Sequence, residues 1–402
     1  MTITGLPGGV TAPDGYLAAG VACGIKTSGL DLALLVSQRP ASAAALFTTN
    51  RAAAAPVHLS RRHLAATGGH ARAIVTNSGC ANACTGAAGD ASARVMADRT
   101  AVALGCRPEE VLVASTGVIG VALDPAKVSA GISAAAGALD RAHGDLAARA
   151  IMTTDPWPKA HAVEVATPQG RFRVGGMAKG SGMIEPSLAT MLAYLTTDAQ
   201  VAPAALRLAL TEACDDTFNA ITVDGECSTN DSLFALANGA SGVRIDGRAE
   251  REALVAGLRA VARELALGIV RGGEGATKLV TVRVTGAASR EDARIAARAM
   301  ANSLLVKTAV HGGDPNWGRL VAVAGRSGAA FELSRARVAI GGVDLFTGGQ
   351  PHDDRAPAAA EVLRGTEVTI TVDLGTGGSH EATVWTCDLS AEYVRINAEY
   401  RT

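Results

Sequence analysis

One threonine with a small residue before it lies between a glycine-rich stretch and an apolar stretch. Thr190 follows Ala189, with Gly175–Met183 upstream and Met191-Leu192 downstream. The Thr190 hydroxyl can attack the Ala189 carbonyl, move the acyl group from nitrogen to oxygen and leave, after hydrolysis, a new N-terminal threonine. Such a residue is a complete nucleophile, because its hydroxyl attacks while its α-amine, with a pKa of about 7.7–8.0, serves as the base. The same pattern also fits the start of a buried strand, so both interpretations stay open.

Another hydroxyl residue stands beside a glycine, directly after an apolar stretch. Val111–Ala114 is typical of a short buried strand, and Ser115-Thr116-Gly117 follows it as a polar exit. A Thr-Gly turn in this place can aim a hydroxyl and backbone N–H groups at the oxyanion of an acyl-transfer reaction. The tripeptide also fits an ordinary turn that ends a strand.

Further polar and glycine-rich segments are candidates for binding sites. Asn77–Gly86 fits either a pocket lining or an Asn/Gly-rich loop. Asp224–Asp231 lacks the alternating ligands and terminal glutamate of an EF-hand, which favours a capped turn over a cation site. His311–Arg319 has no serine in a nucleophile elbow, which favours a rigid turn anchored by Trp317. The glycines of 272–278 do not follow the order of a phosphate loop, so no nucleotide cofactor is predicted.

The composition is that of a folded protein with more than one core. A chain of 402 residues favours two lobes, and 48% hydrophobic against 19% charged residues excludes a disordered chain. The net charge of −1 gives no electrostatic reason to bind nucleic acid. No apolar run is long enough for a membrane span, and no secretory signal is visible. Seven scattered cysteines fit free thiols in a reducing compartment, so we expect a cytoplasmic protein.

Helical and strand patterns alternate along the chain. The clearest helix is Glu252–Val270, where Leu254, Leu258, Val261 and Leu265 fall on one face. We also expect helices over 91–104, 125–148, 203–218 and 290–300, the last with Ser289 as N-cap, and strands over 111–114, 172–174, 279–284, 319–324 and 367–373. The alternation predicts a mixed α/β architecture and leaves the order of the strands undetermined.

Taken together and in this order, the segments resemble the ornithine acetyltransferase (glutamate N-acetyltransferase) family of arginine biosynthesis. The similarity runs essentially from end to end, and its most specific parts are Lys179-Gly-x-Gly-Met183 and Ala189-Thr-Met-Leu192 at this separation. It also includes the segments 77–86, 115–117, 150–155, 228–231, 274–275, 311–319 and 393–402.

The resemblance implies a multilayer α/β sandwich in two lobes that cuts itself between Ala189 and Thr190. The products are an α chain (1–189) and a β chain (190–402) that stay associated, usually as α2β2. Thr190 becomes the nucleophile, and Thr116 with Gly117 become the oxyanion hole. The residues implied to contact substrate are Thr153, Lys179, Thr190, Glu274, Asn397 and Thr402.

The implied reaction moves an acetyl group from N-acetyl-L-ornithine to L-glutamate through an acetyl-Thr190 ester, without cofactor or metal. Lys179 suits the α-carboxylate that both substrates share, Glu274 suits the ornithine ammonium, and Asn397 tolerates either side-chain end. The residues do not decide whether acetyl-CoA is a second donor, nor whether the pathway is primary or secondary. An N-terminal-nucleophile amidohydrolase or aminopeptidase of similar architecture, and an uncut binding protein, are the alternative interpretations.

Overall fold

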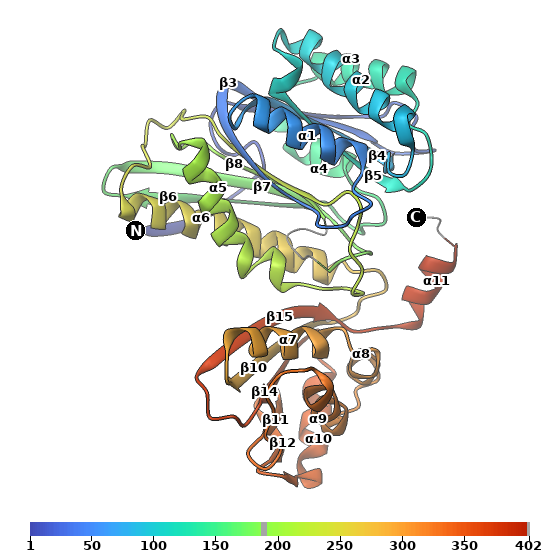
Figure 1. Cartoon of the computed structure of the whole chain (residues 1–402), viewed down its shortest axis with the longest axis vertical. Helices are drawn as coiled ribbons and strands as arrows, with labels where there is room; N and C mark the ends of the chain where they lie inside the picture. The colour runs from blue at the N-terminus through green and yellow to red at the C-terminus, as the bar shows by residue number, and fades with distance from the viewer. Residues whose placement is uncertain (186–190, 400–402) are drawn as a thin grey trace.

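The computed structural model describes residues 1–185 and 191–399 of the chain. The described residues form two lobes, each built around its own sheet (Figure 1). The larger sheet holds β1 (Thr2–Leu6), β2 (Tyr16–Val21), β3 (Leu32–Phe47), β4 (His70–Cys80), β5 (Val111–Val118), β6 (Lys159–Thr167), β7 (Gly170–Lys179), β8 (Leu192–Thr197) and β9 (Ser232–Ala237). Its strand order is β1-β6-β7-β8-β9-β3-β4-β5, with β2 paired to β3.

The second lobe is built on a smaller sheet from the C-terminal part of the chain. Its strands are β10 (Leu279–Ala287), β11 (Arg337–Ile340), β12 (Val343–Thr347), β13 (Gln350–Pro351), β14 (Glu367–Asp373) and β15 (His380–Cys387). Their order is β13-β12-β11-β14-β10-β15, and β10 and β14 run parallel. The predicted mixed α/β architecture in two lobes is confirmed.

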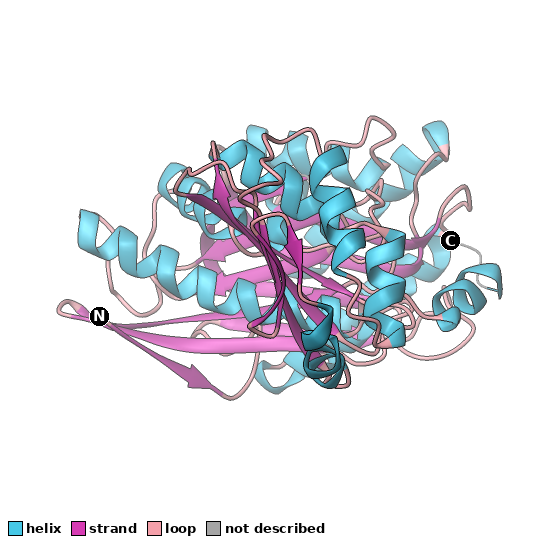
Figure 2. Cartoon of the chain, turned by 90° about the horizontal axis from the view of Figure 1, so that it is seen from below, coloured by secondary structure: helices cyan, strands magenta, loops and turns pink. Residues whose placement is uncertain are grey.

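Helices cover the sheets, and strands form the middle of the molecule in the view from below (Figure 2). With the larger sheet lie α1 (Ala55–Ala66), α2 (Gly86–Leu104), α3 (Pro125–Gly137), α4 (Gly144–Ala150), α5 (Pro203–Asp215) and α6 (Arg248–Arg271). With the smaller sheet lie α7 (Arg290–Ala301), α8 (Leu304–Gly312), α9 (Trp317–Arg326) and α10 (Ala356–Leu363). The last helix, α11 (Ala391–Glu399), stands beside the junction of the lobes (Figure 1).

The larger sheet buries apolar side chains on both faces. Along β3, Leu32 and Leu34 pack in the cluster that includes α2 and α3, whereas Ala33 and Leu35 pack in the cluster that includes α4. Successive side chains of a strand point to opposite faces, so a continuous apolar run such as this one is the signature of a strand covered on both sides.

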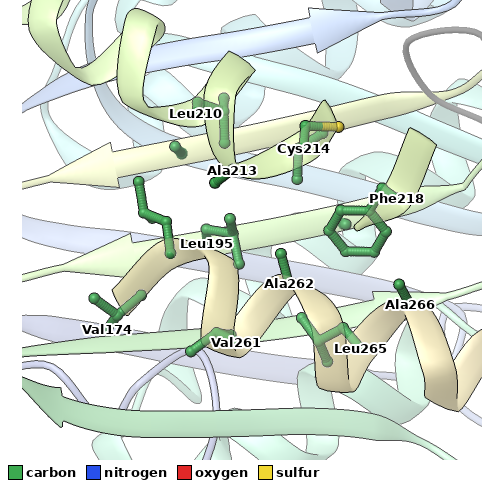
Figure 3. Close-up of a cluster of buried hydrophobic side chains, with 14 of the residues drawn as sticks. Val174, Leu195, Leu210, Ala213, Cys214, Phe218, Val261, Ala262, Leu265 and Ala266 are labelled. Carbon is green, nitrogen blue, oxygen red and sulfur yellow. The ribbon is translucent and has the colours of Figure 1, made fainter. Parts of the chain in front are cut away.

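Two long helices cover the end of this sheet that carries β6 to β9. From α6, Val261 and Leu265 pack toward Val174 of β7 and Leu195 of β8, and Leu210 of α5 joins the same cluster (Figure 3). The predicted apolar face of 252–270 is therefore buried, and the helix extends beyond both predicted ends. This packing fixes β7 and β8, the strands on either side of the predicted cleavage position.

The predicted cleavage position lies between two neighbouring strands of one sheet. β7 and β8 are antiparallel partners, with Lys179 opposite Leu192, and β8 also pairs in parallel with β9. Ala189 and Thr190 themselves lie outside the described residues. The predicted chains 1–189 and 190–402 would therefore share a sheet and a core, and their boundary stays a prediction that does not coincide with the boundary between the lobes.

The helix predicted over 125–148 is wrong as one continuous element. It is interrupted after Gly137, where Asp140 exchanges two backbone hydrogen bonds with Ala18 of β2. The Asp140 carboxylate then accepts a hydrogen bond from the Ala142 N–H at 2.7 Å and starts a new turn, from which α4 follows. A run of alanines has high helix propensity everywhere, so the break is set by glycine and by the aspartate cap.

The strand predicted over 319–324 is also wrong, because these residues lie in the helix α9. The Asn316 side chain caps the helix by accepting a hydrogen bond from the Arg319 N–H at 3.2 Å. Leu320, Val323 and Ala324 are buried on one face, which is helical spacing. A short apolar run cannot be assigned to strand or helix by its periodicity alone.

The other predicted elements are confirmed with shifted ends. The helices at 91–104 and 290–300 lie within α2 and α7, and Ser289 caps α7 through the Asp292 N–H at 3.0 Å. The helix at 203–218 ends at Asp215, and a short 3-10 turn follows. The strands at 172–174, 279–284 and 367–373 lie within β7, β10 and β14. None of the helices in the described ranges is long and apolar enough to pass through a membrane.

Candidate active site

One pocket, with a volume of about 140 Å³, brings together every predicted site residue that the structure describes. Its lining includes Thr116, Gly117, Thr153, Lys179, Glu274 and Asn397. Met191 and Leu192, the first described residues after the predicted cleavage position, line the same pocket. The predicted nucleophile Thr190, its neighbour Ala189 and the predicted contact Thr402 lie outside the described residues.

Thr116 and Gly117 lie inside β5, so the prediction that they form an exit turn is wrong. The strand continues to Val118, and its pairing with β4 becomes irregular at Gly79 and Cys80. Gly117 has a φ of +129°, and a Cβ there would lie 2.3 Å from the Gly79 carbonyl carbon. Only glycine fits this close approach of two backbones, which delivers the Thr116 hydroxyl to the pocket.

The polar segment 77–86 contributes to the irregular pairing of β4 with β5 at Gly79 and Cys80. The Asn77 side chain lies inside β4, where its amide donates a hydrogen bond to the Cys80 carbonyl at 2.8 Å and accepts one from the Ser115 hydroxyl at 2.6 Å. Of the segment 77–86, Ala81 lines the pocket. Residues 81–85 form the predicted loop, and Asn77 in addition supports the irregular end of β4, which the sequence did not indicate.

Lys179 is the last residue of β7 and the only Lys, Arg or His among the described residues that line the pocket. Its ammonium donates hydrogen bonds to the hydroxyls of Thr153, at 2.8 Å, and Thr116, at 3.2 Å. Burial lowers the pKa of Lys179, and the nearby carboxylate of Asp155 acts in the opposite direction. The buried Lys179 ammonium therefore connects Thr116, predicted for the oxyanion hole, with Thr153, predicted to contact substrate.

Asp155 is a buried carboxylate that supports the pocket residues Thr153 and Gly180. Its carboxylate forms a buried ion pair with Lys159 at 2.6 Å and accepts hydrogen bonds from the N–H groups of Gly180, at 2.7 Å, and Thr153, at 3.1 Å. Burial on its own would raise the pKa of Asp155, but Lys179 and Lys159 together lower it. A carboxylate with two cations and two N–H donors stays ionised and fixes the position of its neighbours.

Glu274 and Asn397 form another part of the pocket lining. Glu274 follows the end of α6 and is buried, and its N–H donates a hydrogen bond to the Ser181 carbonyl at 3.0 Å. Asn397 of α11 donates its amide to the Glu274 carboxylate at 2.8 Å. A Cβ on Gly182 would lie 2.4 Å from a Glu274 oxygen, so the second glycine of the Lys-Gly-x-Gly motif leaves space for this carboxylate.

The segment predicted as a capped turn contributes more to the pocket than the sequence indicates. The capped turn exists, because the Asp224 carboxylate accepts the Glu226 N–H at 3.3 Å. Yet Asp224, Glu226 and the run Ser228–Asp231 all line the pocket. The signal that could have revealed them is a dense polar run placed directly before the buried apolar strand β9.

Asp231 is a buried acid in the pocket lining, and its carboxyl group lacks a full set of hydrogen-bond partners. The residue is 3% exposed, and one carboxyl oxygen has no hydrogen-bond partner. Burial raises the pKa of Asp231 well above its ordinary value, although the Ser228 hydroxyl and Lys179 act to lower it. An unpaired carboxyl in a low-dielectric site favours its neutral form, so Asp231 adds less negative charge to the pocket than a solvated aspartate would.

The segment 311–319 does not reach the pocket. The His311 Nδ1–H donates a hydrogen bond to the Asp388 carboxylate at 2.7 Å, and Trp317 stacks on Phe346 in the core of the second lobe. The predicted turn lies at 313–316, between the end of α8 and the start of α9, and Trp317 directly follows it. Its role is to build the second lobe.

Comparisons with known proteins place this chain in a family. A profile of the ArgJ family matches residues 17–402. A protein of Symbiobacterium thermophilum named arginine biosynthesis bifunctional protein ArgJ is 52% identical, and the alignment covers 99% of each chain. Its namesake from Chlorobaculum tepidum is 48% identical, with 97% of this chain and 96% of the relative covered.

A solved structure also matches part of the chain. It is the ornithine acetyltransferase of Mycobacterium tuberculosis complexed with ornithine, 46% identical over 47% of this chain and 100% of that chain, with a TM-score of 0.44. The family assignment rests on the profile and on the full-length relatives. They show that the chain belongs to the ArgJ family and is an acetyltransferase of arginine biosynthesis.

Proposed function

We propose that the chain transfers the acetyl group of N-acetylornithine to glutamate through an ester on Thr190. The observation that carries this proposal is the convergence of Thr116, Gly117, Lys179 and Glu274 on one pocket that Met191 also lines. These residues are separated by up to about 160 positions in the sequence, so the fold alone brings them together.

The proposed reaction has two half-reactions in one pocket. In the first, the Thr190 hydroxyl attacks the acetyl carbonyl, its α-amine takes the hydroxyl proton, and ornithine leaves with that proton on its amine. In the second, the α-amine of glutamate attacks the acetyl ester, the ester C–O bond breaks, a proton from the attacking amine restores the Thr190 hydroxyl, and N-acetylglutamate leaves. Donors at Thr116 and Gly117 would stabilise the oxyanion in both, and one such donor typically contributes about 2.7–4 kcal/mol.

The charges of the pocket suit substrates that share one end and differ at the other. Lys179, the cation of the described lining, is a partner for the α-carboxylate of both substrates. Glu274 is a partner for the ornithine ammonium, and the Asn397 amide can turn its oxygen or its nitrogen toward either side-chain end. Ornithine and glutamate could thus bind in turn without a rearrangement of the backbone.

The reaction itself is tested by its products. Purified protein supplied with N-acetylornithine and glutamate should form N-acetylglutamate and ornithine in equal amounts. If acetate accumulated instead, water would be the acceptor and the enzyme would be an N-terminal-nucleophile amidohydrolase. Acetyl-CoA as an additional donor, an α2β2 assembly and a cytoplasmic location belong to the same proposal, and the first is tested by replacing N-acetylornithine with acetyl-CoA in this assay.

Glu274→Gln should separate the two substrates kinetically. The glutamine keeps the shape and the hydrogen bond to Asn397 but removes the charge that faces the ornithine ammonium. We expect KM to rise roughly 10- to 100-fold for N-acetylornithine and little for glutamate, because a charged hydrogen bond contributes about 1.5–3 kcal/mol.

The measurement is steady-state kinetics with each substrate varied in turn. Glu264→Gln on the exposed face of α6 is the matched control, and its constants should equal those of the wild type. Equal increases of both KM values in Glu274→Gln would contradict the assignment of Glu274 to ornithine.

A further inference from the structure

The last three described residues before the predicted cleavage position, Met183–Glu185, are here named the upstream arm. One carboxylate holds the start of this arm at two points. The Met183 N–H donates to Oδ2 of Asp224 at 2.7 Å, and the Ile184 N–H donates to Oδ1 at 2.8 Å. Adjacent N–H groups bound to the two oxygens of one carboxylate fix both the position and the direction of the backbone.

The arm needs such support because its backbone is strained. Met183 has a φ of +56°, a left-handed conformation that residues with a side chain rarely adopt. Strained residues of this kind persist where surrounding contacts over-determine them, and they cluster at functional sites. The two N–H groups that donate to Asp224 are those of Met183 itself and of the residue that follows it.

The rest of the arm is tied to the part of the chain that lies beyond the predicted cleavage position. The Val223 N–H donates to the Ile184 carbonyl at 2.7 Å. The Glu185 carboxylate accepts hydrogen bonds from the Thr222 hydroxyl, at 3.0 Å, and from the Asn302 amide in the second lobe. Glu185, to which the sequence assigned no role, is therefore a link between the arm and the second lobe.

The chain is equally well fixed on the other side of the predicted cleavage position. The Met191 carbonyl accepts the Ser232 N–H at 2.9 Å, and from Leu192 onward β8 pairs with both β7 and β9. The scissile peptide thus lies between two points of the chain that are both anchored. Asp224 also accepts a hydrogen bond from the Tyr393 hydroxyl at 3.2 Å, which connects the upstream anchor to α11.

We infer that Asp224 is a positioning residue for self-cleavage, assisted by Glu185. This inference rests on the proposed function. In the first step the Thr190 oxygen bonds to the Ala189 carbonyl carbon, the C–N bond breaks, and the hydroxyl proton ends on the released amine. In the second step water hydrolyses the ester, which restores the Thr190 hydroxyl and leaves a carboxylate on Ala189. Both steps depend on a carbonyl held within reach of its attacking oxygen. The contacts of Asp224 and Glu185 fix the chain before the reacting residues, and the pairing of β8 fixes it after them, which limits the freedom of the peptide that must react.

The inference is tested by the rate of cleavage of Asp224→Asn. Asparagine keeps the size of the side chain but offers one carbonyl oxygen where two backbone N–H groups need acceptors. Protein made by pulsed cell-free synthesis is sampled over time, and the 402-residue precursor and its fragments are quantified by intact mass. We expect the half-time of cleavage to lengthen at least tenfold in Asp224→Asn and severalfold in Glu185→Gln, whereas the surface variant Asp246→Asn should cut at the wild-type rate.

Paired measurements separate positioning from folding and from the proposed function. On a Thr190→Ala background, which cannot cut, Asp224→Asn should unfold within a few degrees of the single variant; slow cleavage with equal stability is then a positioning effect. Cleavage of Asp224→Asn at the wild-type rate, or slow cleavage explained by a large loss of stability, would overturn the inference. A wild-type chain that remains uncut would instead overturn the proposed function.

Discussion

Replacing Thr190 by alanine should leave an unbroken polypeptide of 402 residues that transfers no acetyl group. The methyl side chain has no oxygen to attack the Ala189 carbonyl, so no new amine is released. It also has no oxygen to carry the acetyl group, so both half-reactions are lost together. The wild-type protein should give two masses, one for residues 1–189 and one for residues 190–402, and the measurement is intact mass spectrometry beside the acetyl-transfer assay.

Thr190→Ser is the matched control for this prediction. Serine keeps the attacking hydroxyl and loses one methyl group, so we expect it to be cut at the same position and to retain measurable transfer. The two fragments of the wild type should remain together under native conditions, because β7 and β8 are partners in one sheet. A wild-type preparation that is fully active as a single uncut chain would refute the proposed mechanism.

Replacing Lys179 by methionine should reduce kcat/KM for both substrates by a similar, large factor. The ammonium bridges the Thr153 and Thr116 hydroxyls, and it is the cation that faces the shared α-carboxylate in our proposal. Removing one partner from a buried charged interaction costs about 3–5 kcal/mol, which corresponds to roughly 10²- to 10⁴-fold in rate. Kinetics of both half-reactions would show the loss.

The pattern across substrates distinguishes Lys179 from Glu274. Lys179→Met should affect N-acetylornithine and glutamate alike, whereas Glu274→Gln should affect mainly the first. Lys127→Met, which removes an exposed lysine bonded to the Gly24 carbonyl, should behave as the wild type. A Lys179→Met enzyme that loses activity toward only one substrate would show that the lysine does not bind the shared carboxylate.

Sequence reasoning succeeded where the signal was local. The periodic apolar face of 252–270 and the Ser289 cap predicted α6 and α7, because spacing and capping act within a few residues. Family membership also followed from short motifs in a fixed order, and the full-length comparisons confirm it. The same reasoning failed at 319–324, where a short apolar run fits a strand and a helix equally well.

The composition of the pocket was only partly visible in the sequence. The predicted residues that the structure describes do converge, but the acids Asp224 and Asp231 and the α11 residue Tyr393 were not singled out as part of it. Nothing near Asp224 in the sequence indicates that its partners are Met183 and Ile184, about 40 positions earlier. Such contacts depend on which strands become neighbours, and propensity carries no information about that.

The sequence by itself determined the chemistry that is available: a hydroxyl behind a small residue, a lysine in a glycine-rich motif, and helices whose faces are apolar. The tertiary structure decided how those groups are used. It placed Gly117 against the bent end of β4, where a Cβ would collide, and it surrounded Lys179 with Asp155 and two hydroxyls. Local spacing fixes secondary structure within a few residues, whereas an active site is set by side chains packed together from distant parts of the chain.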